Sequence, residues 1–454
     1  MTAKNLLELI GNTPMLEIIR LDTGVCRLFV KLENQNPAGS IKDRIGLSMI
    51  VAAERDGRLK PGGTIIEATA GNTGLGLALV AAQKGYKLIL VVPDKMAREK
   101  IFHLRALGAE VMLTRSDVGK GHREYYQDIA ERIAKETGAF FVNQFGNPAN
   151  PEAHERTTGP EIWEQMGHDV DAVVCGVGSG GTLAGLSRFF ARVSPKTEMV
   201  LADPDGSVLC DYIKTGKYGT AGSWVVEGIG EDFIPAIADF SRVKAAYSIS
   251  DAESLNTARE LLKKEGILGG SSSGTLVAAA LRFCREQKIS KRVVTFICDT
   301  GNKYLSKMFN DYWMADQGFL QRHSYGDLRD IIARRADERA VVTIKPEDTL
   351  MTAYARMKLY DISQIPVLEG EDQVIGLIDE WDLLTAVQDD PAKFRQPVRS
   401  AMTRRLETVG LKTPLASLME TFNKGFVAIV LDQGKFWGLI TRIDVLNYLR
   451  HKAP

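Results

Sequence analysis

The stretch Gly176-Val177-Gly178-Ser179-Gly180-Gly181-Thr182 follows an apolar run, Ala172 to Cys175, and precedes a helical pattern, Leu183 to Arg192. This order predicts a β-strand, a tight loop and an α-helix. Glycines let the backbone approach an anion closely, and a helix N-terminus offers that anion its N–H groups. We interpret the loop as a phosphate site; a tight turn that merely uses glycine is the alternative.

Strand-like and helical stretches alternate on both sides of this loop, from about residue 60 to residue 300. The expected strands are 64–68, 87–92, 109–113, 172–175, 199–202 and 293–298, and the expected helices include 75–84, 98–107, 125–137 and 183–192. Strands that alternate with helices predict parallel sheets joined by crossover helices. The fold class is therefore α/β.

Lys42 lies in a second informative stretch, Ser40-Ile41-Lys42-Asp43-Arg44. Residues 36–40 are typical of a turn and a helix cap, and residues 45–53 are apolar and helical, which places Lys42 in the first turn of a helix. The helix dipole disfavours a cation there, so we expect a lowered pKa for Lys42. Imine formation requires such an unprotonated amine, although most lysines are only solvated surface residues.

Two further polar stretches extend the pattern. Thr69-Ala70-Gly71-Asn72-Thr73-Gly74 lies between an expected strand and an expected helix, where N–H groups suit a carboxylate and the Asn72 amide suits a phenolate oxygen. An ordinary helix cap is the alternative. Ser271-Ser272-Ser273-Gly274 offers a hydroxyl to a ring nitrogen. A lysine, a phosphate loop and such a hydroxyl are what pyridoxal 5′-phosphate (PLP) needs.

The glycine loop also imitates a dinucleotide fingerprint, because Asp203 follows it by about twenty residues at a strand end. An NAD-dependent enzyme is therefore a rival interpretation. It leaves Lys42 and the Asn72 loop without a role, and it places the fingerprint in mid-chain. We favour PLP.

The composition excludes several classes of partner. The 57 basic residues balance the 57 acidic ones, which gives no electrostatic reason to expect nucleic acid or membrane binding. No apolar run approaches the roughly 18 residues of a membrane span, and we see no secretory signal, so we expect a cytoplasmic protein with small-molecule partners. The five cysteines form no C-x-x-C pair and are expected to be reduced, mostly structural thiols.

The chain changes character near residue 315. Residues 314–326 are polar and irregular, and the following segment repeats itself: 374–384 is echoed by 436–446, and 343–357 by 408–422. The period exceeds the roughly 20 to 50 residues of solenoid units, which favours two copies of a small β-α-β-like module. We expect a catalytic domain over 1–315, a linker over 316–326, and a tandem domain over 327–454 with repeats at about 327–390 and 396–454.

With these motifs the chain resembles the cystathionine β-synthases. They belong to the fold type II PLP enzymes, which also include O-acetylserine sulfhydrylase and threonine synthase. The resemblance covers nearly the whole length through Gly11-Asn12-Thr13-Pro14, Ser40 to Arg44, Thr69 to Gly74, Gln144-Phe145, Gly178 to Thr182, Glu227 to Gly230 and Gly266 to Gly274. It implies two parallel-sheet α/β subdomains followed by a pair of CBS modules.

The resemblance also implies a role for each candidate residue. Lys42 would be the Schiff-base lysine, and the other cofactor contacts would be Asn72 at the ring oxygen, Ser272 at the pyridine nitrogen, and Gly178, Ser179, Gly180, Gly181 and Thr182 at the phosphate. The substrate carboxylate would lie against Thr69, Ala70, Gly71, Thr73 and Gln144. Gly228, Ile229, Gly230 and Glu231 would line the mouth of the site. No metal is expected.

The implied reaction is transsulfuration by β-replacement. L-Serine and L-homocysteine give L-cystathionine and water through an enzyme-bound aminoacrylate, with the freed Lys42 amine moving the Cα proton. A hydroxyl at Ser272 cannot keep the pyridine protonated, which favours replacement over transamination. A cysteine synthase using O-acetylserine and sulfide, a serine or threonine dehydratase and a non-catalytic adenosyl-ligand sensor are the alternatives.

Three residues at the mouth depart from the family pattern. Ala70 stands where Ser is frequent, Phe145 where synthases can have Tyr, and Glu231 where some have Tyr. These departures concern the second substrate more than the cofactor. We expect Glu231 to pair with the distal ammonium of homocysteine, with a solvated loop carboxylate as the alternative.

The CBS-module resemblance implies an adenosyl ligand. Thr441 and Asp444 would contact its ribose, as would Asp382 in the first copy, and Ile365 with Pro366 would lie near the base. Asp379 replaces the threonine in the first copy, so that site is expected to be degenerate. A purely structural dimerisation module is the alternative. The family also implies a homodimer or higher homo-oligomer. We expect no haem, because the motif Gly11 to Pro14 begins only ten residues from the start, without the haem-binding extension of animal synthases.

Overall fold

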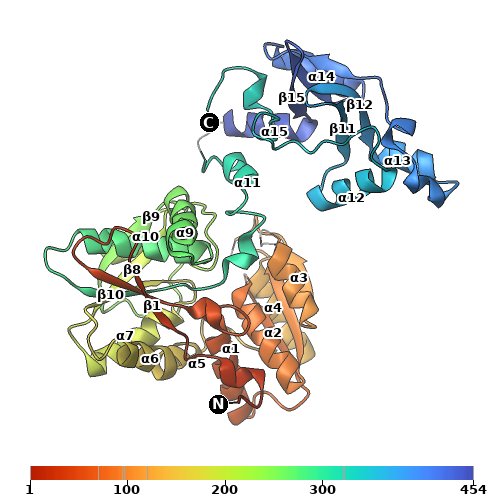
Figure 1. The fold of residues 1–454 in the computed structure, drawn as a ribbon. Coiled ribbons are helices and arrows are strands. Elements are labelled where there is room, and N and C mark those ends of the chain that lie inside the picture. The colour runs from red at the N-terminus through yellow and green to blue at the C-terminus, as the bar shows by residue number, and fades with distance from the viewer. Residues whose placement is uncertain are drawn as a thin grey trace. The chain divides into compact units, whose positions relative to one another are not determined.

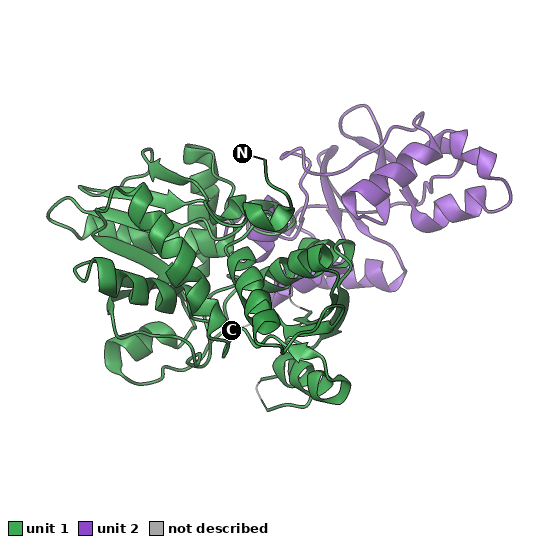
Figure 2. Ribbon diagram, turned by 90° about the horizontal axis from the view of Figure 1, so that it is seen from below, with its two compact units in different colours: residues 1–310 green, residues 311–454 purple. Residues whose placement is uncertain are grey.

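The computed structural model describes residues 2–69, 71–94, 96, 98–119, 121–320 and 323–452, with side chains as far as residue 450. It divides into two compact units, residues 1–310 and residues 311–454 (Figure 2). Helix α11 (Asp311–Asp316) lies at the start of the second unit. The segment expected to be irregular from residue 314 therefore begins with the end of a helix, and Met314 is fully buried.

Unit 1 contains a six-stranded sheet in the order β1-β2-β10-β7-β8-β9. Its strands are β1 (Met15–Ile18), β2 (Arg27–Lys31), β7 (Ala172–Gly176), β8 (Glu198–Pro204), β9 (Val243–Ile249) and β10 (Arg292–Phe296). All pairs are parallel except β1 with β2. Helices α9 (Asp251–Glu265) and α10 (Ser271–Arg285) lie on one face, and α6 (Gly159–Gln165) and α7 (Gly181–Val193) lie on the other (Figure 1).

A second, fully parallel sheet in unit 1 has the order β5-β4-β3-β6. Its strands are β3 (Thr64–Ala68), β4 (Lys87–Pro93), β5 (Glu110–Thr114) and β6 (Phe140–Phe141). The helices around it are α1 (Lys42–Arg55), α2 (Asn72–Lys84), α3 (Arg98–Ala106) and α4 (Tyr126–Thr137) (Figure 1). The prediction of an α/β fold with parallel sheets is confirmed.

Two glycines bring α1 and α2 into close contact. A Cβ on Gly46 would lie 2.8 Å from the carbonyl carbon of Gly76, and a Cβ on Gly76 would lie 2.7 Å from the carbonyl oxygen of Lys42. Only glycine at both positions permits this approach. The contact places the first turn of α1, with Lys42, beside the first turns of α2.

Helix α5 (Ala149–Ala153) and a π-helical turn over His154–Thr158 lie between β6 of the second sheet and β7 of the first. Helix α8 (Leu209–Thr215) lies between β8 and β9 of the six-stranded sheet. Strands β7 and β8 are buried along almost their whole length, as their near-continuous apolar sequences require in a sheet covered on both faces.

Unit 2 contains the two sequence repeats. The first has helix α12 (Leu350–Tyr360), the antiparallel pair β11 (Gln364–Glu369) and β12 (Gln373–Asp379), and helix α13 (Glu380–Val387). The second has β13 (Glu407–Val409), α14 (Leu415–Asn423), the pair β14 (Ala428–Asp432) and β15 (Lys435–Ile440), and α15 (Arg442–Lys452). Each copy has its own hydrophobic core.

The repeats match in detail. The parallel pairing of β13 with β14 has its counterpart in the first copy as a single parallel bridge between Ile344 and Val367. Each copy is therefore β-α-β-β-α, one strand and one helix longer than the expected β-α-β-like module. Within the part of the chain that the structure describes, no helix is both long and apolar enough to span a membrane.

Candidate active site

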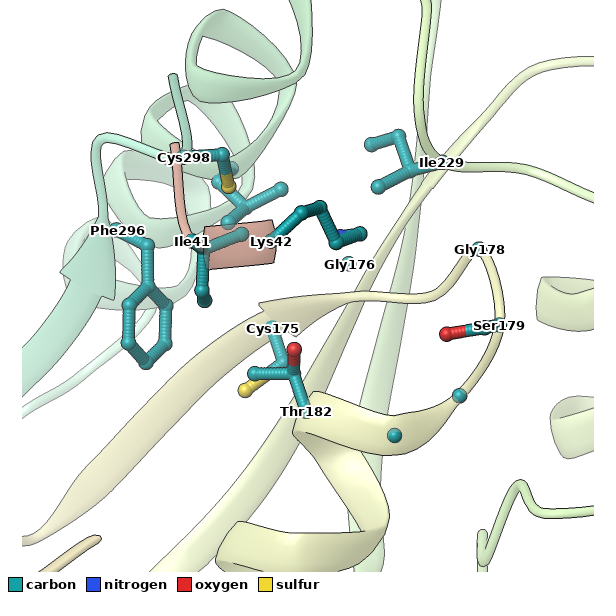
Figure 3. A pocket seen from close by; sticks show the side chains of 13 residues that line it. Ile41, Lys42, Cys175, Gly176, Gly178, Ser179, Thr182, Ile229, Phe296 and Cys298 are labelled. Atoms are coloured by element: carbon teal, nitrogen blue, oxygen red, sulfur yellow. The ribbon is translucent and has the colours of Figure 1, made fainter. Parts of the chain in front are cut away.

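A cavity of about 430 Å³ in unit 1 brings most of the candidate residues together. Its lining includes Lys42, Thr69, Gly71, Asn72, Thr73, Gln144, Gly178, Ser179, Gly228, Ile229, Gly230, Glu231 and Ser272. Gly180, Gly181 and Thr182 line an adjoining pocket that Lys42, Gly178 and Ser179 share (Figure 3). Ala70 lies outside the described residues.

Lys42 is the first residue of α1, as the cap signature before it predicts. Figure 3 shows its side chain extending towards the glycine loop. The pKa of Lys42 is lowered, mainly by burial and further by the Lys100 ammonium, while Cys298 and Asp299 act in the opposite direction. The expected direction is thus found, but burial rather than the helix end is its main cause.

The glycine loop connects β7 to the N-terminus of α7, with Gly180 as the capping residue at φ +89°. Two of its glycines have no room for a side chain. A Cβ on Gly178 would lie 2.6 Å from the Gly228 carbonyl oxygen, and one on Gly181 would lie 1.9 Å from Asn150 Oδ1. These contacts tie the loop to the mouth of the cavity and to α5.

The donors at this end of the cavity fit a phosphate group. The described side chains that line it include the Lys42 amine and the Ser179 and Thr182 hydroxyls, and no carboxylate. Asn150 Nδ2 donates to Ser179 Oγ at 2.9 Å, and Thr182 Oγ1 lies 3.2 Å from the ring nitrogen Nε2 of the buried His154. A helix N-terminus with hydroxyls and an amine beside it is an anion-binding arrangement.

Thr69 and Gly71 lie between β3 and α2, and Asn72, Thr73 and Gly74 are the first residues of α2. Gly71, at φ +130°, donates its N–H to Thr69 Oγ1 at 3.2 Å. Thr73 Oγ1 donates to Gln144 Oε1 at 2.7 Å, and Gln144 Nε2 donates to the Ala68 carbonyl at 3.3 Å. The described residues expected to hold a substrate carboxylate therefore lie near the N-terminus of α2 in two hydrogen-bonded pairs, Gly71 with Thr69 and Thr73 with Gln144.

Asn72 is the first residue of α2, and its amide has two partners that stand in none of the motifs described above. Nδ2 donates to Asp299 Oδ2 at 2.7 Å, and Oδ1 accepts from Lys303 Nζ at 2.9 Å. Both partners follow β10, the strand next to β7. No local pattern in the sequence connects them with Asn72.

Ser272 lies in the first turn of α10, buried, beside the thiol of Cys298. All five cysteines are free thiols, as expected. Burial raises the pKa of Cys298 to about 12, so the group is a neutral thiol at physiological pH. Cys298 lines the cavity together with Lys42 and Ser272, so its surroundings are those of a site residue.

The mouth residues are held by a buried ion network. Lys100 Nζ donates to Glu227 Oε2 at 2.6 Å, and Lys307 Nζ donates to Glu227 Oε1 at 2.8 Å. Gly230 donates its N–H to the Val177 carbonyl at 2.8 Å, which joins the mouth to the glycine loop. Glu231 is half-buried at the same edge, near Tyr126.

Asp203 does not support the dinucleotide alternative. It lies on β8, fully buried, and its Oδ2 accepts the backbone N–H of Cys210 at 2.8 Å. It is absent from the described lining of the cavity around the glycine loop. The described residues also contain no group of three or more His, Cys, Asp or Glu side chains that could hold a metal ion.

Unit 2 has its own cavity, of about 720 Å³. Pro366, Thr441 and Asp444 line it, whereas Ile365 and Asp382 are not among its described lining residues. Asp444 Oδ2 accepts from the Thr441 N–H at 2.7 Å and from Thr441 Oγ1 at 2.5 Å. Asp379 and Asp382 form a reciprocal capping box at the start of α13.

Comparison with known proteins agrees with this geometry. Residues 6–299 match the family model described as pyridoxal-phosphate dependent enzyme, and residues 329–389 and 398–451 match the CBS domain. The chain is 34% identical to a cystathionine beta-synthase of Dictyostelium discoideum over 98% of this chain and 92% of that protein. The chain belongs to the cystathionine β-synthase family of pyridoxal-phosphate dependent enzymes.

Other proteins are similar to unit 1 of this chain alone. The chain is 42% identical to cysteine synthase A of Escherichia coli (strain K12), over 65% of this chain and 92% of that protein. The crystal structure of a hydrogen sulfide-producing enzyme from Fusobacterium nucleatum has a TM-score of 0.62 and 37% identity, and covers 67% of this chain and 100% of that one. The tandem CBS domains thus separate the full-length relatives from the shorter ones.

Proposed function

We propose that this protein joins L-serine and L-homocysteine to L-cystathionine and water by PLP-dependent β-replacement. The observation that carries the proposal is the convergence of Lys42, the glycine loop, Asn72 and Ser272 on two adjoining pockets, the larger of which also reaches Glu231. Full-length similarity to cystathionine beta-synthases, with both CBS domains included, supports the same reaction.

PLP, when bound, supplies the carbonyl that captures the substrate amine and the conjugated ring that accepts electrons from Cα. The Lys42 amine would hold the cofactor and then carry the proton between Cα of serine and its departing hydroxyl. Its lowered pKa fits this role, because only a neutral amine accepts a proton. Thr69, Gly71, Thr73 and Gln144 would orient the substrate carboxylate.

The second substrate distinguishes this reaction from that of a cysteine synthase. Homocysteine carries its own ammonium and carboxylate, whereas sulfide carries neither. A carboxylate at the cavity edge, Glu231, gives the distal ammonium a partner, and sulfide would not need one. We therefore place homocysteine, with its thiol directed inward, as the nucleophile.

Product analysis tests the proposal. The purified protein is supplied with PLP and either serine and homocysteine or O-acetylserine and sulfide. Cystathionine from the first pair at a rate well above cysteine from the second supports the proposal, and the reverse result identifies a cysteine synthase. Ammonia and a keto acid as the main products would identify a dehydratase, and absence of every product would identify a non-catalytic ligand sensor.

We further propose an adenosyl ligand, such as S-adenosylmethionine or AMP, for the cavity of unit 2. Asp444 and Thr441 line this cavity and support an adenosyl ligand, because a carboxylate can accept hydrogen bonds from both hydroxyls of a ribose. We also propose a cytoplasmic homodimer or larger homo-oligomer that needs no haem. Light scattering after gel filtration measures its mass, and the absorption spectrum of the purified protein tests for haem.

A further inference from the structure

The side-chain amide of Asn72 lies between two groups of opposite hydrogen-bonding character. Lys303 Nζ, which can only donate while charged, lies 2.9 Å from Oδ1. Asp299 Oδ2, which can only accept while ionised, lies 2.7 Å from Nδ2. The pair therefore fixes which end of the amide is oxygen and which is nitrogen, a choice that a more symmetrical environment would leave open.

Both partners of Asn72 are themselves held in place. Lys303 Nζ also donates to the carbonyl oxygens of Ala38 at 3.0 Å and Gly39 at 3.2 Å, so all three ammonium protons are used. Asp299 Oδ2 also accepts the Tyr304 hydroxyl at 2.7 Å. Lys303 is 4% exposed and Asp299 is fully buried. Neither can turn away from the amide without also losing at least one further buried hydrogen bond.

Asp299 and Lys303 together form what we call the Asn72 clamp. The clamp determines which hydrogen-bonding group of the Asn72 amide faces the cavity. One Nδ2 proton goes to Asp299 and Oδ1 is directed at Lys303, so the second Nδ2 proton is the group that Asn72 can offer to the cavity that it lines. A reversed amide would present its oxygen instead. Against the phenolate oxygen of PLP this would set two acceptors opposite each other and lose a charge-assisted hydrogen bond.

We propose that Lys303 and Asp299 are positioning residues that fix the Asn72 amide with its N–H group, rather than its oxygen, available to the ring oxygen of PLP. The inference rests on the proposed function, since it concerns how that cofactor is held. It extends the cofactor site to Asp299 and Lys303, which follow β10 and are not among the described residues that line the cavity.

The protonation state of Lys303 gives a second, independent test of the clamp, because it should make the PLP absorption band depend on pH. Burial, with the Lys100 ammonium, lowers the pKa of Lys303 to about 8, while Asp299 and Asp43 oppose this; His103 and Tyr304 are the other titratable groups nearby. Above that pH the neutral amine has a lone pair and can also accept, so it no longer excludes the reversed amide. An arginine at this position stays donor-only throughout.

The test compares four variants of the full chain loaded with PLP. Lys303→Met removes the donor, Lys303→Arg restores it, and Asp299→Asn replaces the acceptor by an amide of the same shape that can donate or accept. Asn302→Ala, which changes the exposed neighbour of Lys303 in the same short 3-10 helix (Gly301–Tyr304), is the control. The dissociation constant of PLP and the position of its visible absorption band are measured from pH 6.5 to 9.5, and circular dichroism checks folding.

We expect Lys303→Met and Asp299→Asn to weaken PLP binding roughly tenfold and to shift the visible band, because a directed hydrogen bond is lost. Lys303→Arg should stay near the parent protein and lose the band's pH dependence near pH 8, and Asn302→Ala should change nothing. A parent-like spectrum and affinity in folded Asp299→Asn would overturn the clamp, as would parent-like values in folded Lys303→Met. A parent protein that forms no visible band with PLP would overturn the proposed function instead.

Discussion

The cavity around Lys42 and the cavity in unit 2 differ in how their polar residues are held. Around Lys42 the polar side chains come from distant parts of the chain and hold one another, as Asn72 does with Asp299 and Lys303. In unit 2, the polar pair Thr441 and Asp444 is three residues apart and forms the start of one helix. Helix capping alone explains the second pair, whereas nothing local explains the first.

This difference determines which property each substitution should change most. Substitution of a residue whose side chain caps no helix should affect the chemistry of the site more than the stability of the fold. Residues that also cap a helix should affect both, so their ligand role needs a matched variant to isolate it.

Lys42→Ala should have the largest effect. Without the Lys42 amine, no group links the cofactor to the protein and none transfers the Cα proton. We therefore expect cystathionine formation to fall by at least about a thousandfold. Borohydride reduction followed by peptide mass spectrometry should find PLP on Lys42 in the parent protein. Reduced PLP on another lysine of the parent would contradict the assignment, and the exposed Lys60→Ala is the control.

Ser272→Asp should come next. A carboxylate would accept the N–H of the pyridine, keep its nitrogen protonated and make the ring a stronger electron sink, which favours side reactions over replacement. We expect PLP to remain bound while kcat for cystathionine formation falls roughly 10- to 100-fold. Steady-state kinetics and the absorption spectrum measure the two effects. An undiminished replacement rate would show that a neutral partner at this position is unimportant.

The sequence predicts the elements of unit 1 best where strand and helix alternate regularly. The expected strand 64–68 has the bounds of β3, and the expected helix 125–137 differs from α4 by one residue. The short strands β1, β2 and β6 and the strand β9 were not predicted. The antiparallel pair β1 and β2 lies at the sheet edge, and β2 gains its place by pairing with β10, far along the chain. Pairing of this kind leaves no local signal.

The candidate site shows the same limit. Lys42, Asn72, the glycine loop and Ser272 stand in motifs with recognisable turns and helix starts, and all of them line the same pair of adjoining pockets. Lys100, Asp299 and Lys303 stand in no such motif. Lys303 reaches Asn72 from 231 positions away, and an isolated lysine in a sequence is normally a solvated one. Only the fold reveals that it is buried.

Glu231→Ala tests the edge of the catalytic cavity. If the carboxylate pairs with the distal ammonium of homocysteine, KM for homocysteine should rise roughly tenfold, while KM for serine stays the same. Asp232→Ala is the matched comparison, because it removes the same charge from the next position, which also lines the cavity. Equal changes in the two variants would indicate a general electrostatic effect, and an unchanged homocysteine KM in Glu231→Ala would exclude the pairing.

Asp444→Ala and Asp382→Ala give the smallest effects and the sharpest test of unit 2. Each removes the carboxylate that accepts a backbone N–H at the start of its helix, so each should cost about 1 kcal/mol of stability, measured by chemical denaturation. Of the two aspartates, only Asp444 is among the described residues that line the cavity. Calorimetric titration with S-adenosylmethionine and with AMP should therefore show weaker binding, by roughly tenfold, in Asp444→Ala alone. Equal affinities in the two variants would assign both aspartates to helix capping, because the shared loss of stability then accounts for everything that either residue does.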